Sequence, residues 1–126
     1  MKPIARPVYL NLLRIHLPLT GWVSILHRVS GVLLFAALPL GVGGLAVSLS
    51  DESGFRRMAD WVTHPLATFL FLALVWAFAQ HVFAGLRHLA LDAQWGADLK
   101  HARQSSLAVM LASGLVTLLA AWGLLA

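Results

Sequence analysis

The sequence contains no cysteine and very little charge. The lack of cysteine excludes disulfides, a thiolate nucleophile and any iron–sulfur cluster ligated by thiolates of this chain. Charged residues make up only 11% of the chain, whereas soluble domains have about 25%. So few charges do not cover a globule of 126 residues. No basic stripe interleaved with aromatics is present, so we expect no nucleic-acid partner.

Long apolar runs are what the chain has instead, because 60% of its residues are hydrophobic. About 20 mainly apolar residues cross a bilayer as a helix, and three runs reach that length, at 29–49, 65–86 and 105–126. We therefore predict an all-α membrane protein that forms a single transmembrane domain over 1–126. Its three helices are expected at about 22–49, 65–90 and 105–126, after an N-terminal lead-in at 1–21. A turn of interfacial helix is expected around 55–61, and Pro39 is a candidate kink in the first span.

The positive charges predict the orientation of these spans. Seven of the nine lysines and arginines lie in the N-terminal segment or between the second and third spans. Because positive charge accumulates on the cytoplasmic side, the N-terminus should face the cytoplasm, or the matrix in an organelle. We place the protein in a bacterial inner membrane, with the mitochondrial inner membrane as the alternative.

His81 is the histidine that lies well inside an apolar run. It shares one helical face with Gly85, His88 and Asp92. Ionisable residues inside a span usually face the protein interior and have a function. Two interpretations stay open from spacing alone. His81 is either a metal ligand or a neutral histidine that bonds a neighbouring helix, with Gly85 as a packing site.

A second polar cluster stands at the entry to the first span. Ser24, His27, Arg28 and Gly31 fall on one arc of a helix, so a hydroxyl, an imidazole and a guanidinium converge there. The plainer interpretation is that Arg28 snorkels to the headgroups and Ser24 caps the helix. Up-and-down topology puts this cluster at a depth similar to that of His81. A haem with its iron at His81 and its propionates toward His27 and Arg28 fits that placement, as does a quinone carbonyl that accepts from Ser24 and Arg28.

The two clusters also carry a family resemblance. Residues 24–31 (SILHRVSG) resemble the S-I-x-H-R-x-[ST]-G signature of the cytochrome b subunit of succinate dehydrogenase. Residues 81–88 (HVFAGLRH) resemble that family's H-x-x-x-G-x-R-H signature, which an aspartate follows as Asp92 does here. Arg6 and Pro7, before the amphipathic lead-in, also fit the family. The resemblance covers nearly the whole chain.

The resemblance implies a membrane anchor with haem b and ubiquinone. His81 is implied as an axial ligand of the haem iron, Ser24 and Arg28 as quinone-pocket residues, and His27, with Arg28, as a neighbour of the haem propionates. The implied partners are a second three-helix anchor subunit that supplies the other axial ligand, an iron–sulfur subunit and a flavoprotein subunit. FAD and the iron–sulfur clusters would lie only in those partners, and this chain alone would have no catalytic residue.

Three other functions remain open at this point. A fumarate reductase anchor runs the same carriers in reverse. A small proton or ion transport subunit would use His81 and Arg28 as relays and would show no visible absorption. A purely structural anchor would keep full quinone reductase activity after His81→Ala.

Overall fold

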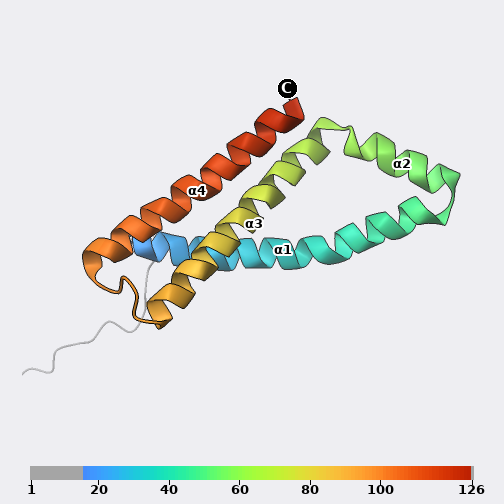
Figure 1. The fold of residues 1–126 in the computed structure, drawn as a ribbon. Coiled ribbons are helices and arrows are strands. Elements are labelled where there is room, and N and C mark those ends of the chain that lie inside the picture. Colours follow the sequence, from blue (N-terminus) through green and yellow to red (C-terminus); the bar gives the residue numbers. More distant parts are fainter. Residues whose placement is uncertain (1–15, 126) are drawn as a thin grey trace, which may run out of the picture.

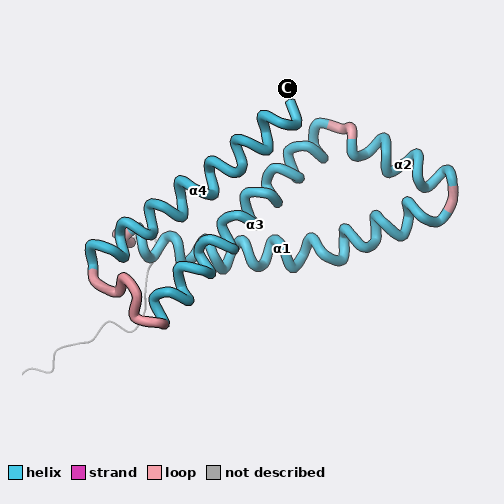
Figure 2. Tube along the Cα trace, viewed as in Figure 1, coloured by secondary structure: helices cyan, strands magenta, loops and turns pink. Residues whose placement is uncertain are grey.

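The computed structural model describes residues 16–125, and every regular element in that range is a helix. The elements are α1 (Leu19–Ser50), α2 (Glu52–Val62), α3 (Pro65–Asp92) and α4 (Leu99–Leu125). Short turns join them (Figure 2). The start of α1, the end of α3 and the start of α4 lie at one end of the molecule (Figure 1). The all-α fold that the sequence predicts is confirmed.

Helices α1, α3 and α4 are each long and apolar enough to cross a membrane. A helix of 28 residues, the length of α3, is about 42 Å long, whereas the hydrocarbon core is about 30 Å thick. The polar ends of the helices therefore reach into the headgroup layers. The three spans match the three apolar runs. However, α1 begins at Leu19 rather than near residue 22, and α4 begins at Leu99 rather than at residue 105.

Asp98 explains the earlier start of α4. Its carboxylate accepts a hydrogen bond from the backbone N–H of His101 at 3.3 Å and contacts His101 Nδ1 at 2.5 Å. The side-chain bond to His101 holds the pKa of Asp98 below its usual value. A capped first turn keeps the polar residues 99–104 helical. The turn before it is tight, because Gln94 and Gly96 both adopt positive φ.

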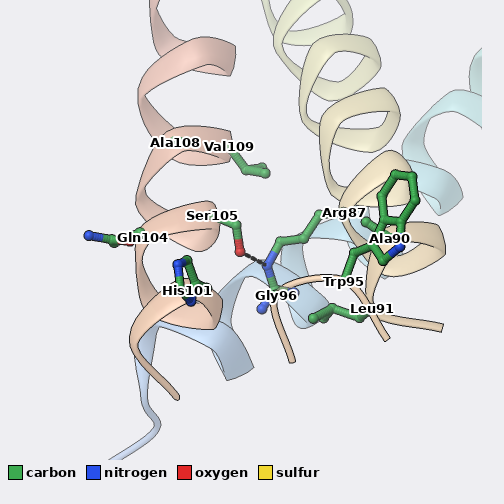
Figure 3. Close-up of a pocket in the computed structure, with 10 residues that line it drawn as sticks. All are labelled: Arg87, Ala90, Leu91, Trp95, Gly96, His101, Gln104, Ser105, Ala108 and Val109. Carbon is green, nitrogen blue, oxygen red and sulfur yellow. Dashed lines mark hydrogen bonds between the residues drawn. The ribbon is translucent and has the colours of Figure 1, made fainter. Parts of the chain in front are cut away.

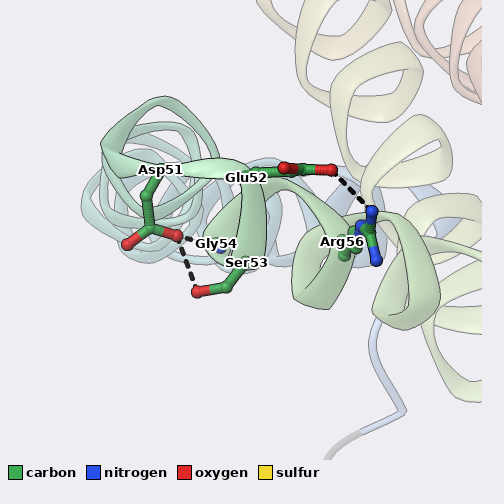
Figure 4. Close-up of polar contacts among 5 residues, drawn as sticks. All are labelled: Asp51, Glu52, Ser53, Gly54 and Arg56. Atoms are coloured by element: carbon green, nitrogen blue, oxygen red, sulfur yellow. Dashed lines mark hydrogen bonds and ion pairs between the residues drawn. The ribbon is translucent and has the colours of Figure 1, made fainter.

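The predicted interfacial turn is a full helix of 11 residues, α2. Asp51 caps it, since its Oδ1 accepts from the Gly54 N–H at 2.6 Å and from the Ser53 hydroxyl at 2.7 Å (Figure 4). These bonds, the one from Ser53 foremost, lower the pKa of Asp51. Gly54 is buried against the last turn of α1, where a Cβ would overlap the carbonyl of Val47. The end of α1 thus packs directly on the start of α2, and α1 itself continues as one helix through Pro39.

The buried core is small and lies between α1, α3 and α4. Val23, Ala84 and Val109 form its centre, and Phe83 and Met110 pack on it. Helix α3 contacts both other spans (Figure 1), and its buried positions are mostly alanine. Small residues let membrane helices approach closely. Most large apolar side chains instead face outward, as expected for a surface covered by lipid or by other helices.

Away from this core, α1 and α3 diverge and α2 bridges their far ends (Figure 1). An apolar cleft of about 660 Å³ opens between these three helices. Its floor includes small residues of α1, namely Ala36, Ala37, Gly41 and Gly44.

Candidate functional site

The structure brings His27 of α1 against His81 of α3. Their rings are stacked, with centroids 4.2 Å apart and planes inclined by 15°. The ring centroid of His88, two turns after His81, lies 5.2 Å from that of His27. The two polar clusters found in the sequence are therefore one site, built across the α1–α3 interface.

Hydrogen bonds fix the orientation of the His81 ring. Its Nδ1 lies 3.1 Å from the backbone oxygen of His27 and 3.3 Å from Ser30 Oγ. Because a carbonyl oxygen only accepts, Nδ1 carries the proton in this contact. The neutral ring then has its lone pair on Nε2. Within the described residues Nε2 has no hydrogen-bond partner, and it is not one of the fully buried polar atoms. His81 therefore offers an oriented, accessible nitrogen ligand.

Two glycines make the close approach of α1 and α3 possible. A Cβ at Gly31 would lie 3.0 Å from His81 Cε1, and a Cβ at Gly85 would lie 3.5 Å from His27 Nε2. Each glycine thus accommodates the histidine of the opposite helix. Gly85 is therefore a site of close helix packing, the role that the sequence offered for it.

The polar groups of the site favour a metal held by a macrocycle over a bare ion. Among residues 16–125, no three or more His, Asp or Glu side chains converge in a way that could hold a metal ion. An iron already coordinated by a planar porphyrin needs only axial ligands from protein. One oriented imidazole, with its second nitrogen bonded to a carbonyl, is the arrangement seen for histidine ligands of metals. The residues present therefore fit a haem better than a bare metal ion.

Ser24 and Arg28 lie one turn apart on α1, beside His27. Ser24 is half-buried and Arg28 is exposed. Neither side chain forms a hydrogen bond to another described residue. Their donors point to no acceptor that this part of the chain provides. Asp92, which shares a helical face with His81, is exposed at the end of α3.

Arg87 is a residue to which the sequence reasoning gave no site role, because it was counted only among the positive charges that predict the orientation. It lies on α3, inside the helix expected at 65–90, and is only 8% exposed. Its Nε donates to Ser105 Oγ at 3.1 Å (Figure 3). Its Nη2 donates to the Ala102 carbonyl at 3.3 Å. Helical periodicity was the signal that could have identified the buried position of Arg87. Gln80, Ala84 and Arg87 follow one another at spacings of four and three residues, so they share one buried face of the helix.

Comparison with known proteins decides the family. A family model described as "Succinate dehydrogenase/Fumarate reductase transmembrane subunit" matches residues 2–121. The chain belongs to this family. It is therefore an integral membrane subunit of a succinate dehydrogenase or fumarate reductase complex, as the two signatures indicate. Arg6 and Pro7 of the resemblance, and most of the lead-in at 1–21, lie outside the described residues.

Curated relatives agree with this assignment. The succinate dehydrogenase cytochrome b556 subunit of Paracoccus denitrificans is 34% identical over 90% of this chain and 88% of that protein. The subunit of the same name from Coxiella burnetii is 33% identical over 91% of this chain and 93% of its own length. The mitochondrial succinate dehydrogenase cytochrome b560 subunit of Bos taurus is 32% identical over 88% of this chain and 68% of that protein.

Proposed function

We propose that this chain is a membrane-anchor subunit of succinate dehydrogenase that helps bind haem b and contributes half of a ubiquinone site. The oriented His81 imidazole is the observation that carries the proposal. His81 would hold the haem iron, and His27 and Arg28 would be the partners of its propionates. The bound haem would supply a one-electron carrier close to the quinone.

The protein around His81 has three tasks in this proposal. The His27 carbonyl and Ser30 hold the Nδ1 proton, which keeps Nε2 available as a ligand. The apolar surroundings limit the entry of water. The guanidinium of Arg28 offsets the negative charge of a propionate.

Ser24 and Arg28 are proposed as the quinone donors of this chain. Quinone reduction adds electrons and protons at carbonyl oxygens. A hydroxyl and a guanidinium fixed on one helical turn stabilise the charge that develops on such an oxygen. Both donors are unpaired within the described residues, so the acceptor and the remaining walls of the proposed pocket come from outside residues 16–125.

The proposed partners are those that the family resemblance implies. This chain has no cysteine to ligate clusters, and the described histidines supply a single oriented ligand. We place the second axial ligand on a second three-helix anchor subunit. An iron–sulfur subunit and an FAD-carrying flavoprotein subunit deliver electrons from succinate. The predicted location is a bacterial inner membrane with the N-terminus in the cytoplasm.

The haem part is tested with His81→Ala in the purified complex. We expect the reduced-minus-oxidised spectrum to lose its low-spin bis-histidine signal. His64→Asn is the matched control, because it removes an imidazole at the opposite end of α3 and keeps a side chain able to cap that helix. An unchanged low-spin spectrum in His81→Ala would show that another residue holds the iron.

The quinone part is tested with Ser24→Ala and Arg28→Lys. Succinate–quinone reductase activity should fall in both, while transfer from succinate to a soluble dye is retained. Lysine snorkels as well as arginine but lacks the guanidinium fork. Full quinone activity in both variants, at normal assembly, would remove Ser24 and Arg28 from the site. Assaying quinol–fumarate reductase activity in the same preparation determines which direction the complex favours.

A further inference from the structure

A second polar site lies on the other face of α3, between its last turns and the start of α4. It is a pocket of about 310 Å³ that is separate from the paired histidines (Figure 3). Its walls are mostly apolar and include Ala90, Leu91, Ala108 and Val109. Arg87 is the one residue of the pocket that is both charged and buried.

The charge of Arg87 lacks a counter-ion in the part of the chain that the structure describes. Ion pairs there join Arg56 to Glu52 and His101 to Asp98, and none includes Arg87. Asp98 is engaged by His101, and Asp92, the carboxylate nearer to Arg87 in sequence, is exposed and forms no ion pair among the described residues. A guanidinium has five N–H donors, and only two contacts to neutral oxygens are present. Burying a charge without an opposite charge is costly, so this pocket is suited to an anion.

The surroundings of the pocket indicate which anion. The pocket lies where α3 ends and α4 begins, which is the level of the lipid headgroups, and the exposed Trp95 lines it. Lys100 and Arg103 on the exposed first turns of α4 add positive potential. The apolar walls suit hydrocarbon and not a small hydrated ion. Basic pockets between spans on the positively charged side recognise anionic lipid headgroups.

We propose that this pocket binds one anionic phospholipid. Arg87 contacts the phosphate with the N–H groups that Ser105 and Ala102 do not use. The glycerol and the upper part of an acyl chain lie along Ala108 and Val109. The lipid thereby supplies the missing negative charge and fills the space between α3 and α4.

The experiment uses the whole complex, purified in detergent and stripped of lipid. Native mass spectrometry counts bound lipid during titration with phosphatidylglycerol, phosphatidylcholine or inorganic phosphate. We expect the wild-type complex to bind one more phosphatidylglycerol than the Arg87→Gln complex, whose binding at this site should be about tenfold weaker. Phosphatidylcholine should bind almost equally to the wild type and to the variant. Arg103→Gln is the matched control, because it removes an exposed positive charge of α4 that does not line the pocket. This variant should bind phosphatidylglycerol as the wild type does.

Ala108→Phe is the second variant, in case Arg87→Gln does not assemble. It fills the pocket from an exposed position and leaves the Arg87 hydrogen bonds in place, and it should also lose one phosphatidylglycerol. Equal phosphatidylglycerol binding in wild type and both variants would overturn the proposal. Inorganic phosphate that binds as tightly as the lipid would show a free-anion site instead. If the wild-type complex takes up no lipid at this pocket and the Arg87→Gln complex loses a partner subunit, the counter-ion of Arg87 is a carboxylate of that partner.

Discussion

At the scale of single residues, the two glycines opposite the paired histidines are not equivalent. A methyl group at Gly31 would approach His81 Cε1 to 3.0 Å, which is closer than ordinary packing allows. At Gly85 the nearest atom, His27 Nε2, would lie at 3.5 Å, an ordinary van der Waals contact. Position 31 therefore controls the placement of the proposed iron ligand, whereas position 85 tolerates a small side chain.

We accordingly expect Gly31→Ala to shift the haem spectrum or midpoint potential and Gly31→Val to lower haem content in the purified complex. Gly85→Ala should leave both nearly unchanged, because its methyl fits and alanine favours the helix over glycine. Haem content per complex and a redox titration provide the measurements. Equal effects at the two positions would mean that the His81 ring is not set by contact with α1.

At the scale of elements, α3 is the helix that joins the two sites. One face carries His81 toward α1, and another carries Gln80 and Arg87 toward α4. Gln80 is fully buried, and its Oε1 accepts from the Ser113 hydroxyl of α4 at 2.9 Å. Its Nε2 has no partner within the described residues. In hydrocarbon such a bond between helices contributes about 0.6–2 kcal/mol, so this pair helps fix the α3–α4 register.

Ser113→Ala should therefore lower the thermal stability of the complex, because it leaves Gln80 Oε1 buried without a donor. Gln80→Leu combined with Ser113→Ala should recover much of the loss, since removing both polar partners together leaves nothing unsatisfied. Thr117→Val is the control, because its hydroxyl bonds only the Ser113 carbonyl of its own helix. A double variant as unstable as the sum of the two single variants would contradict this interpretation of the pair.

At the scale of the whole molecule, the polar groups of both proposed sites lie toward the same end. The paired histidines, Arg28 and Arg87 belong to the first third of α1 or the second half of α3. The start of α1, the end of α3 and the start of α4 lie at one end of the molecule (Figure 1). The other end holds the apolar cleft and the amphipathic helix α2. An anchor that receives electrons from a soluble partner needs its redox groups on the side of that partner.

The charge distribution predicts that this end faces the cytoplasm. Alkaline phosphatase fused after α4 should be active, because this enzyme folds only outside the cytoplasm. Green fluorescent protein fused at the same site should be dark, because it is exported there through the general secretory route. A phosphatase placed in the turn 93–98 should be inactive. The opposite pattern would invert the topology and place both polar sites on the wrong side for the proposed partners.

The sequence by itself determined the spans and the candidate residues of the main site. Three apolar runs without charges leave helices as the only way to satisfy the backbone in lipid. Helical periodicity then fixed which polar residues share a face of each span. For this reason His81, His27 and the serine–arginine pair at 24 and 28 were identifiable before any contact was known. The amphipathic segment at 55–61 was likewise visible, although its capping by Asp51 extended it to Glu52–Val62.

Only the tertiary structure decided how the faces meet. Periodicity gives directions around one helix and says nothing about which neighbour a residue contacts. The position of the proton on His81 Nδ1 depends on a backbone carbonyl of α1. The role of the two glycines is visible only in the packed helices, where each leaves space for the histidine of the opposite helix. Arg87 became a buried group because Asp98 starts α4 early enough to bring Ala102 and Ser105 within its reach. Such contacts depend on the packing of separate helices, which no single segment of the sequence specifies.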